Sequence, residues 1–226
     1  MVKVFAFVKM NLLILMKNKL SFAWSIMLPT IIFFINRDNI TSVNDIVYWL
    51  VFIVINIFLY GVGLQALEEK DSGVLSIIFS INWIPFEYFT GLLLTQIIYS
   101  IVVTTIFGLV PMAILGFNYG VLLLLSLLTI IVSIPIAFLS YNVTFLKSLH
   151  SKTVTSILNI ISFLFFITLG IDSPINIINP YIVIGRQVNS IMPGKIDIVY
   201  LLVSILIIML SLPSIIYFRP LSKEGR

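Results

Sequence analysis

Residues 88–146 read YFTGLLLTQIIYSIVVTTIFGLVPMAILGFNYGVLLLLSLLTIIVSIPIAFLSYNVTFL, a stretch of 59 residues without a charged side chain. One membrane-spanning helix needs about 17–25 residues, so this stretch is too long for a single span. The segment Gly116-Phe117-Asn118-Tyr119-Gly120 interrupts it with turn-forming residues. Because the apolar runs on either side are continuous rather than alternating, they favour helices over barrel strands. The stretch therefore predicts two spans, at about 88–114 and 120–146.

The composition of the whole chain agrees with a membrane protein. It is 60% hydrophobic and 10% charged, whereas soluble domains contain about 25% charged residues. The chain has no cysteine and one histidine, His150, which argues against disulfides, thiolate metal sites and multi-histidine metal sites. A net charge of +4 suits anionic lipid headgroups better than nucleic acid. We expect no bound metal and no nucleic-acid partner.

Four further gaps between charged residues have the length of a span. They cover residues 20–36, 46–67, 153–171 and 198–218. With the two spans above, the sequence predicts an all-α integral membrane protein whose residues 1–226 form a single transmembrane domain with six transmembrane helices. An even number of spans places both termini on the same side of the membrane.

Positive charge is divided unequally between the two sides of this arrangement. If the N-terminus lies in the cytoplasm, the inner side carries ten Lys and Arg residues and the outer side carries three. This excess is typical of cytoplasmic loops, and we therefore expect both termini to be cytoplasmic. The inner residues are Lys3, Lys9, Lys17, Lys19, Lys70, Lys147, Lys152, Arg219, Lys223 and Arg226, and the outer ones are Arg37, Arg186 and Lys195.

Two segments outside the spans are partly apolar. In residues 1–19 a helical arrangement gathers Lys3, Asn11, Lys17 and Asn18 on one arc, which favours a helix along the inner membrane surface over a simple extension of the first span. Residues 172–197 form the last outer loop, which is rich in Pro and Asn but contains the apolar run 181–185. That run predicts a short helix or a re-entrant segment whose backbone is buried in protein.

Several chemistries are disfavoured. The chain contains no Gly-x-x-x-x-Gly-Lys-Ser/Thr sequence that could cradle a phosphate. The predicted spans contain no ionisable Asp, Glu, Lys, Arg or His, which argues against proton-driven transport but leaves sodium coupling through carbonyls and hydroxyls open. The pair Glu68–Glu69 is reminiscent of membrane-embedded proteases. Those enzymes also need an arginine soon after the pair and histidines on later helices, whereas His150 lies in a short loop.

The densest charge cluster, LEEKDSG at residues 67–73, follows the second predicted span. Glu68, Glu69 and Asp71 give it acidic groups that can meet a basic or polar partner. After Gly73 comes an apolar patch at residues 74–79, and Pro85 then begins the next span. This order predicts a cytoplasmic docking element. A solvated loop that merely ends the span is the simpler alternative.

The stretch LEEKDSGVLSIIFSINWIPFEYFTGLLL, residues 67–94, resembles the segment after the second span in ABC-2-type ABC transporter permeases. In that family an acidic pair, a glycine, an apolar step, a proline and a second glycine lead into span three. The chain has these residues in the same order, and it also has an asparagine, a proline and an arginine in the last outer loop, which resemble the family's extracellular helical hairpin. The matching residues are Glu68, Glu69, Asp71, Gly73, Pro85, Gly91, Asn179, Pro180 and Arg186.

The resemblance implies a function. In such permeases two copies or two homologous subunits pair, and each contacts a separate ATPase subunit through the segment after span two. ATP and magnesium would be bound by that partner, and this chain would bind no cofactor and catalyse no reaction itself. Glu68, Glu69, Asp71 and Gly73 would couple ATP hydrolysis to movement of the spans, in the plasma membrane of a bacterium.

Polar residues inside the predicted spans are candidates for a transport pathway. They are Asn56, Gln65, Gln96 and Thr104, although such residues more often hydrogen-bond between helices. Without intramembrane charge, an ionic substrate would find no partner for its desolvated charge. An amphipathic or hydrophobic substrate fits better, and the resemblance suggests a cytolytic or antimicrobial peptide, such as a phenol-soluble modulin. The alternatives are a non-transporting scaffold or immunity protein and a sodium-coupled carrier or channel.

Overall fold

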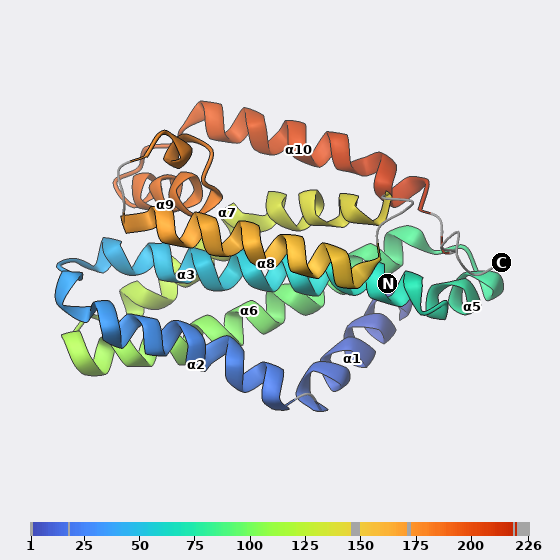
Figure 1. Ribbon diagram of the computed structural model, residues 1–226, viewed down its shortest axis with the longest axis horizontal. Coiled ribbons are helices and arrows are strands. Elements are labelled where there is room, and N and C mark those ends of the chain that lie inside the picture. The colour runs from blue at the N-terminus through green and yellow to red at the C-terminus, as the bar shows by residue number, and fades with distance from the viewer. Residues whose placement is uncertain (1, 18, 146–149, 171–172, 219, 221–226) are drawn as a thin grey trace.

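The computed structural model describes residues 2–17, 19–145, 150–170, 173–218 and 220, and these residues form helices and turns without a strand. The helices lie mostly along one long axis (Figure 1). In chain order they are α1 (Val2–Lys17), α2 (Lys19–Asn36), α3 (Val43–Phe58), a π-helical segment (Leu59–Leu64), α4 (Gln65–Asp71), α5 (Val74–Ile81), α6 (Pro85–Leu115), α7 (Tyr119–Tyr141), α8 (Ser151–Ile167), α9 (Pro180–Ile191) and α10 (Ile198–Ile216). Single 3-10 turns cover Arg37–Asn39, Asn142–Phe145, Thr168–Gly170 and Pro174–Ile177.

Among the described residues, four helices are long and apolar enough to cross a membrane. The apolar helix α8, with 17 residues, is shorter, and α2 meets the same test only when it is joined to α1, from which it bends by 64°. The helical class predicted from the sequence is thus confirmed. The four long helices are Val43–Asp71, Pro85–Leu115, Tyr119–Phe145 and Ile198–Ile216.

The break predicted within residues 88–146 is confirmed. Gly116 ends α6 in the left-handed conformation, with φ of 70°, which glycine adopts without a steric penalty. Asn118 then caps α7, because its Oδ1 accepts a hydrogen bond from the amide of Gly120 at 2.8 Å. At the start of α3, Asp45 Oδ2 accepts a bond from the amide of Ser42 at 2.8 Å. Local side chains therefore set these helix ends.

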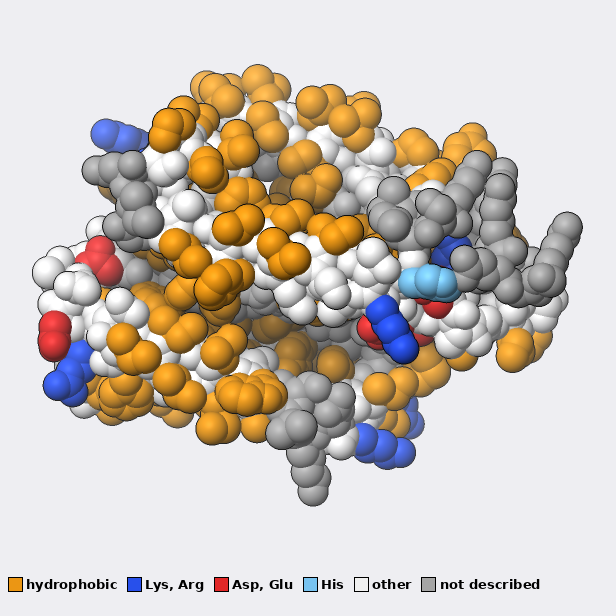
Figure 2. Space-filling model, viewed as in Figure 1, with side chains coloured by type: hydrophobic (Ala, Val, Ile, Leu, Met, Phe, Trp, Pro, Cys, Tyr) orange, Lys and Arg blue, Asp and Glu red, His pale blue; other side chains and the backbone are white. Residues whose placement is uncertain are grey.

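The surface carries an uncharged band. Apolar side chains cover the middle of the bundle, whereas charged side chains gather toward its two ends and along α1 (Figure 2). Many of the exposed side chains on α2, α8 and α10 are large and apolar. Such a surface suits the hydrocarbon core of a bilayer, which is about 30 Å thick.

The helix α1 packs beside α6 rather than standing free. Phe7, Val8 and Asn11 are its buried residues, and a Cβ at Gly91 of α6 would lie 2.6 Å from Phe7 Cβ. The sequence predicted that Asn11 lies on one polar side of this helix together with Lys3, Lys17 and Asn18. This placement was wrong, because Asn11 faces the protein, where its Oδ1 accepts a long contact of 3.5 Å from Gln65 Nε2. Lys3 and Lys17 are exposed, and Asn18 lies outside the described residues.

The predicted outer loop contains the helix α9, at the opposite end of the bundle from α5 (Figure 1). Asn179 caps α9, since its Oδ1 accepts a bond from the amide of Tyr181 at 2.9 Å, and Pro180 occupies the first helical position. The side-chain nitrogen Nδ2 of Asn179 also donates to the carbonyl of Phe165 at 2.8 Å. The apolar run 181–185 is largely buried, as a helix packed on protein requires.

Candidate functional site

The cluster LEEKDSG ends the long helix formed by α3, the π-helical segment and α4. Helix Val43–Asp71 has 29 residues, so it is about 44 Å long at 1.5 Å per residue. It is therefore longer than the thickness of a hydrocarbon core, which is about 30 Å. Gly73 has a φ of 76°, and its amide donates to the carbonyl of Lys70 at 3.1 Å. This glycine allows the chain to turn into α5.

Glu69 points into the protein. Its Oε2 accepts a hydrogen bond from the Tyr88 hydroxyl at 2.8 Å, and its Oε1 accepts one from Gln65 Nε2 at 2.9 Å. Tyr88 belongs to α6 and is fully buried. The carboxylate therefore joins α4 to α6, and its charge is satisfied by protein donors.

Lys70 and Asp71 join α4 to other parts of the bundle. Lys70 is buried, and its Nζ donates at 2.6 Å to the carbonyl of Thr144, in the 3-10 turn that follows α7. Asp71 Oδ2 accepts a bond from the amide of Ser151 at 2.8 Å. Because Ser151 is the first residue of α8, its amide lacks a helical partner and Asp71 satisfies it.

Glu68 is the exposed carboxylate of the cluster. Partial burial raises the pKa of its carboxyl group, and the neighbouring charges of Glu69 and Asp71 raise it further. A side chain in this position prefers a cation or a hydrogen-bond donor beside it. The structure thus separates the predicted coupling residues: Glu68 is available for a partner, whereas Glu69 and Asp71 are bound within the chain.

Replacing Asp71 with alanine is expected to destabilise the folded chain by about 1 kcal/mol, the usual loss for a removed helix cap. Replacing Glu68 with alanine is expected to change stability by less than about 0.5 kcal/mol, because an exposed side chain is removed. Denaturant unfolding of both variants in detergent micelles measures the difference. Equal losses for the two variants would contradict the assignment of Asp71 to the start of α8.

The helix α5, which follows the acidic cluster in the chain, carries an exposed apolar face. Leu75 and Phe79 are buried against the bundle, whereas Ile77 and Ile81 are 67% and 84% exposed. α5 lies at one end of the molecule (Figure 1). The apolar face continues over Val74, Trp83 and Phe86, which are about half exposed. This surface, residues 74–86 together with Glu68, is called the docking face below.

The four pathway candidates differ in burial and in the partners that they bond. Gln96 is buried and its Nε2 donates to the carbonyl of Gly61 at 3.1 Å, and Thr104 donates to the carbonyl of Ser100 in its own helix at 2.7 Å. Both therefore serve contacts within the bundle. Asn56 and Gln65 are half-buried and lie on the more accessible side of the α3–α4 helix.

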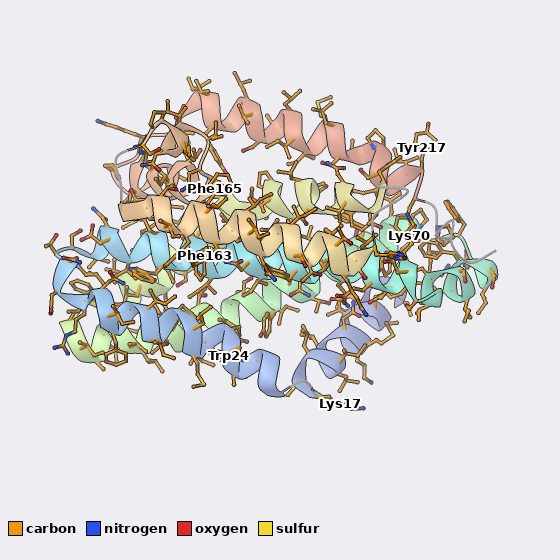
Figure 3. All side chains as sticks on the ribbon, viewed as in Figure 1. Lys17, Trp24, Lys70, Phe163, Phe165 and Tyr217 are labelled. Carbon is orange, nitrogen blue, oxygen red and sulfur yellow. The ribbon has the colours of Figure 1, made fainter. Side chains whose placement is uncertain are left out.

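The surface near α8 and α2 is hollowed. Figure 2 shows this hollow between α8 and α2 on the viewed face, and Figure 3 labels Phe163 on α8 and Trp24 on α2, the helices on its two sides. Both of these side chains are more than half exposed. The hydroxyl of Tyr60 on the π-helical segment donates to Asn159 Oδ1 on α8. Asn159 is exposed, so its side-chain amide is a polar group among the exposed apolar side chains of α8.

Tyr60 and Asn159 were missed by the sequence analysis. A π-helical segment shifts the pairing of backbone carbonyls and often occurs at functional positions. Here the carbonyl of Phe58 accepts a bond from Ser140 Oγ at 3.2 Å and that of Gly61 is bound by Gln96. The glycines of the run YGVG, residues 60–63, were the available signal, because they allow other helices to approach closely.

At the other end of the bundle, the predicted hairpin residues Asn179 and Pro180 begin α9, and Arg186 is exposed on it. Arg186 borders an open hollow with Ser173, Pro174, Asn176 and Ile177. Within the described ranges, no group of three or more His, Cys, Asp and Glu could hold a metal ion.

No family model, no curated protein and no solved structure matches this chain. The features of the chain that bear on its function are the docking face, the bonds of the acidic cluster and the hollow between α2 and α8.

Proposed function

We propose that this chain is the transmembrane permease subunit of an ATP-driven exporter, of the ABC-2 type that its sequence resembles. The observation that carries the proposal is the docking face, which is exposed and apolar and includes Glu68. The charged residues next to Glu68 in the chain form hydrogen bonds within the bundle. Glu69, Lys70 and Asp71 connect the docking face to α6, to the turn after α7 and to α8. A force applied at this face would reach three helices through short polar bonds.

The partner at the docking face is a separate ATPase subunit, which binds ATP and magnesium. An apolar centre with a charged group beside it is the usual composition of a protein interface. The direct test is to purify the tagged chain from its own cells in mild detergent and assay hydrolysis of MgATP. Co-purification of a P-loop ATPase with hydrolysis activity supports the proposal, and a pure chain with no hydrolysis contradicts it.

The proposed arrangement has six spans, formed by α2, the α3–α4 helix, α6, α7, α8 and α10, in a bacterial plasma membrane. α1 lies along the inner surface, both termini are cytoplasmic, and α9 with the turn before it forms the outer hairpin. The exposed Lys3, Lys9 and Lys17 of α1 favour anionic lipid headgroups on the cytoplasmic side.

A cysteine at Asn44 is expected to react with a membrane-impermeant maleimide added to intact cells, whereas a cysteine at Ser72 is expected to react only after the cells are opened. Both side chains are exposed, so accessibility of the site is matched. The chain has no native cysteine, which removes background labelling. Labelling of position 72 from outside would reverse the orientation and remove the docking face from the cytoplasm.

The hollow between α2 and α8 supports a second permease copy or a homologous permease as a further partner. Asn159 and the half-buried Asn56, Tyr60 and Gln65 are costly against lipid, because hydrocarbon offers them no hydrogen bonds. A second subunit across this hollow would cover them, and the space between the two subunits would form the pathway.

The proposed substrate is an amphipathic peptide of the cytolytic or antimicrobial kind. The accessible polar side chains Asn56, Tyr60 and Asn159 are uncharged, and α2 and α8 expose large apolar side chains, which matches a molecule with one polar and one apolar side. Cells that lack the gene are expected to become more sensitive to added amphipathic peptides. If only the handling of a lipid or a hydrophobic drug changes, the peptide is the wrong substrate.

A further inference from the structure

We propose that Tyr88 is a positioning residue that fixes the docking face to the transmembrane bundle, so that movement of α4 and α5 is passed to α1 and α6. This inference rests on the proposed function for its meaning, but the contacts on which it depends are independent of any partner. Tyr88 lies near the start of α6 and is fully buried.

The ring of Tyr88 contacts aromatic rings from three other parts of the chain. Its centroid lies 5.6 Å from that of Phe7 on α1, 5.9 Å from that of Phe79 on α5 and 6.1 Å from that of Phe218, which follows α10. Phe79 and Phe218 also contact each other at 5.6 Å. The contacts with Phe7 and Phe79 are edge-to-face and that with Phe218 is tilted, and such aromatic pairs add to the stabilisation from burial. The ring thus connects the docking helix to segments that are far away in sequence.

The hydroxyl of Tyr88 supplies the directional part of this connection. It donates to Glu69 Oε2 at 2.8 Å, and a hydrogen bond to a charged acceptor is stronger than a neutral one. Glu69 belongs to α4, and its other oxygen is held by Gln65, whose amide also reaches Asn11 of α1. One side chain of α6 therefore fixes both α4, through the carboxylate, and α5, through Phe79.

The connection matters because α4 and α5 are joined by a turn at Gly73. Its φ of 76° is available to glycine without strain, and a Cβ placed there would meet only Ser76 Oγ, at 3.9 Å. Without the bond to Tyr88, Lys70 and Asp71 would still join α4 to the turn after α7 and to α8. The placement of α4 and α5 against α1 and α6 would then rest mainly on apolar packing, which is not directional.

The protein contains a matched control for the hydroxyl. Tyr141 is also fully buried, and its ring belongs to the same cluster, 5.8 Å from Phe218 and 5.0 Å from Phe89. Its hydroxyl has no hydrogen-bond partner among the described residues. Tyr88→Phe removes a bonded hydroxyl, and Tyr141→Phe removes an unbonded one from the same surroundings.

The test measures the distance between α1 and α5 with spin labels on Lys3→Cys and Ser80→Cys, two exposed positions in a chain without native cysteine. In the purified full chain in nanodiscs, Tyr88→Phe is expected to widen the distance distribution by about twofold, because α5 becomes free to swing. Tyr141→Phe is expected to leave it unchanged. Glu69→Ala, which removes the acceptor, is expected to reproduce the effect of Tyr88→Phe.

A purely structural role would lower the unfolding midpoint of Tyr88→Phe without widening the distribution. That result overturns the inference. Equal widening of the distance distribution by Tyr141→Phe also overturns it. If Tyr88→Phe does not fold, the distance distribution of Glu69→Ala is the test. With the ATPase subunit bound, Tyr88→Phe is expected to retain the partner and MgATP hydrolysis but to lose most of the transport per ATP. Absence of any ATPase would remove the proposed function and leave the spin-label result to decide on the inference.

Discussion

Alanine at position 63 is expected to destabilise the folded chain by about 1–3 kcal/mol, the usual range for an overpacked interior. A Cβ at Gly63 would lie 2.3 Å from the carbonyl oxygen of Ser140 and 2.6 Å from its carbonyl carbon. Both atoms belong to the backbone of α7, so no side-chain rotation can relieve the overlap. The π-helical segment and α7 would have to separate where Ser140 Oγ donates to Phe58.

Gly108→Ala is the matched control for Gly63→Ala. Gly108 also lies within a long helix, but the nearest atom to an added Cβ is Cε2 of Tyr119 at 3.5 Å, an ordinary contact distance. Its substitution is expected to be neutral or to stabilise by up to about 1 kcal/mol, because alanine favours helix. Unfolding by SDS or urea in mixed micelles measures both variants. Similar midpoints for the two would show that α7 does not approach Gly63 as closely as the structure indicates.

Glutamate at both Ile77 and Ile81 is expected to reduce the amount of ATPase subunit that co-purifies with this chain by at least about tenfold, which corresponds to about 1.4 kcal/mol. The two side chains are 67% and 84% exposed, so their replacement removes apolar surface at the centre of the docking face without disturbing the interior. In protein interfaces a few residues near the centre contribute about 2 kcal/mol or more each.

The control for this double variant uses the opposite end of the bundle. Ile177 and Ile178 are 76% and 71% exposed, and glutamates there add the same charge to the same residue type. This control is expected to retain the ATPase subunit in full. If the double variant at 77 and 81 retains as much ATPase as the control, the docking face is not the contact surface.

The sequence alone was sufficient to predict where the long helices lie and where several of them begin or end. The uncharged gaps predicted where long apolar helices lie, and Gly116 and Asn118 predicted the break between α6 and α7. Asn179 caps α9 and Pro180 is its first residue. Both act locally, because a helix cap and the fixed φ of proline affect only the few residues around them. Local chemistry of this kind is readable without knowledge of distant contacts.

The separation of the acidic cluster could not be predicted from the sequence. Consecutive residues on a helix point about 100° apart, so Glu68, Glu69 and Asp71 face different neighbours although the sequence presents them as one group. Their partners Tyr88 and Ser151 come from other helices. The contacts at the π-helical segment were equally hidden, because Gln96 of α6 donates to the carbonyl of Gly61 and Ser140 of α7 donates to that of Phe58, the residue before the segment.

The most direct test of the proposed function is transport by the purified chain and its ATPase subunit in inside-out vesicles. A fluorescently labelled amphipathic peptide and MgATP are added outside, and the label trapped inside is measured over time. An ATP-driven exporter is expected to accumulate the peptide with MgATP, but not with a non-hydrolysable ATP analogue or with a sodium gradient alone. Accumulation driven by the sodium gradient without ATP, or no accumulation under any condition, would contradict the proposal.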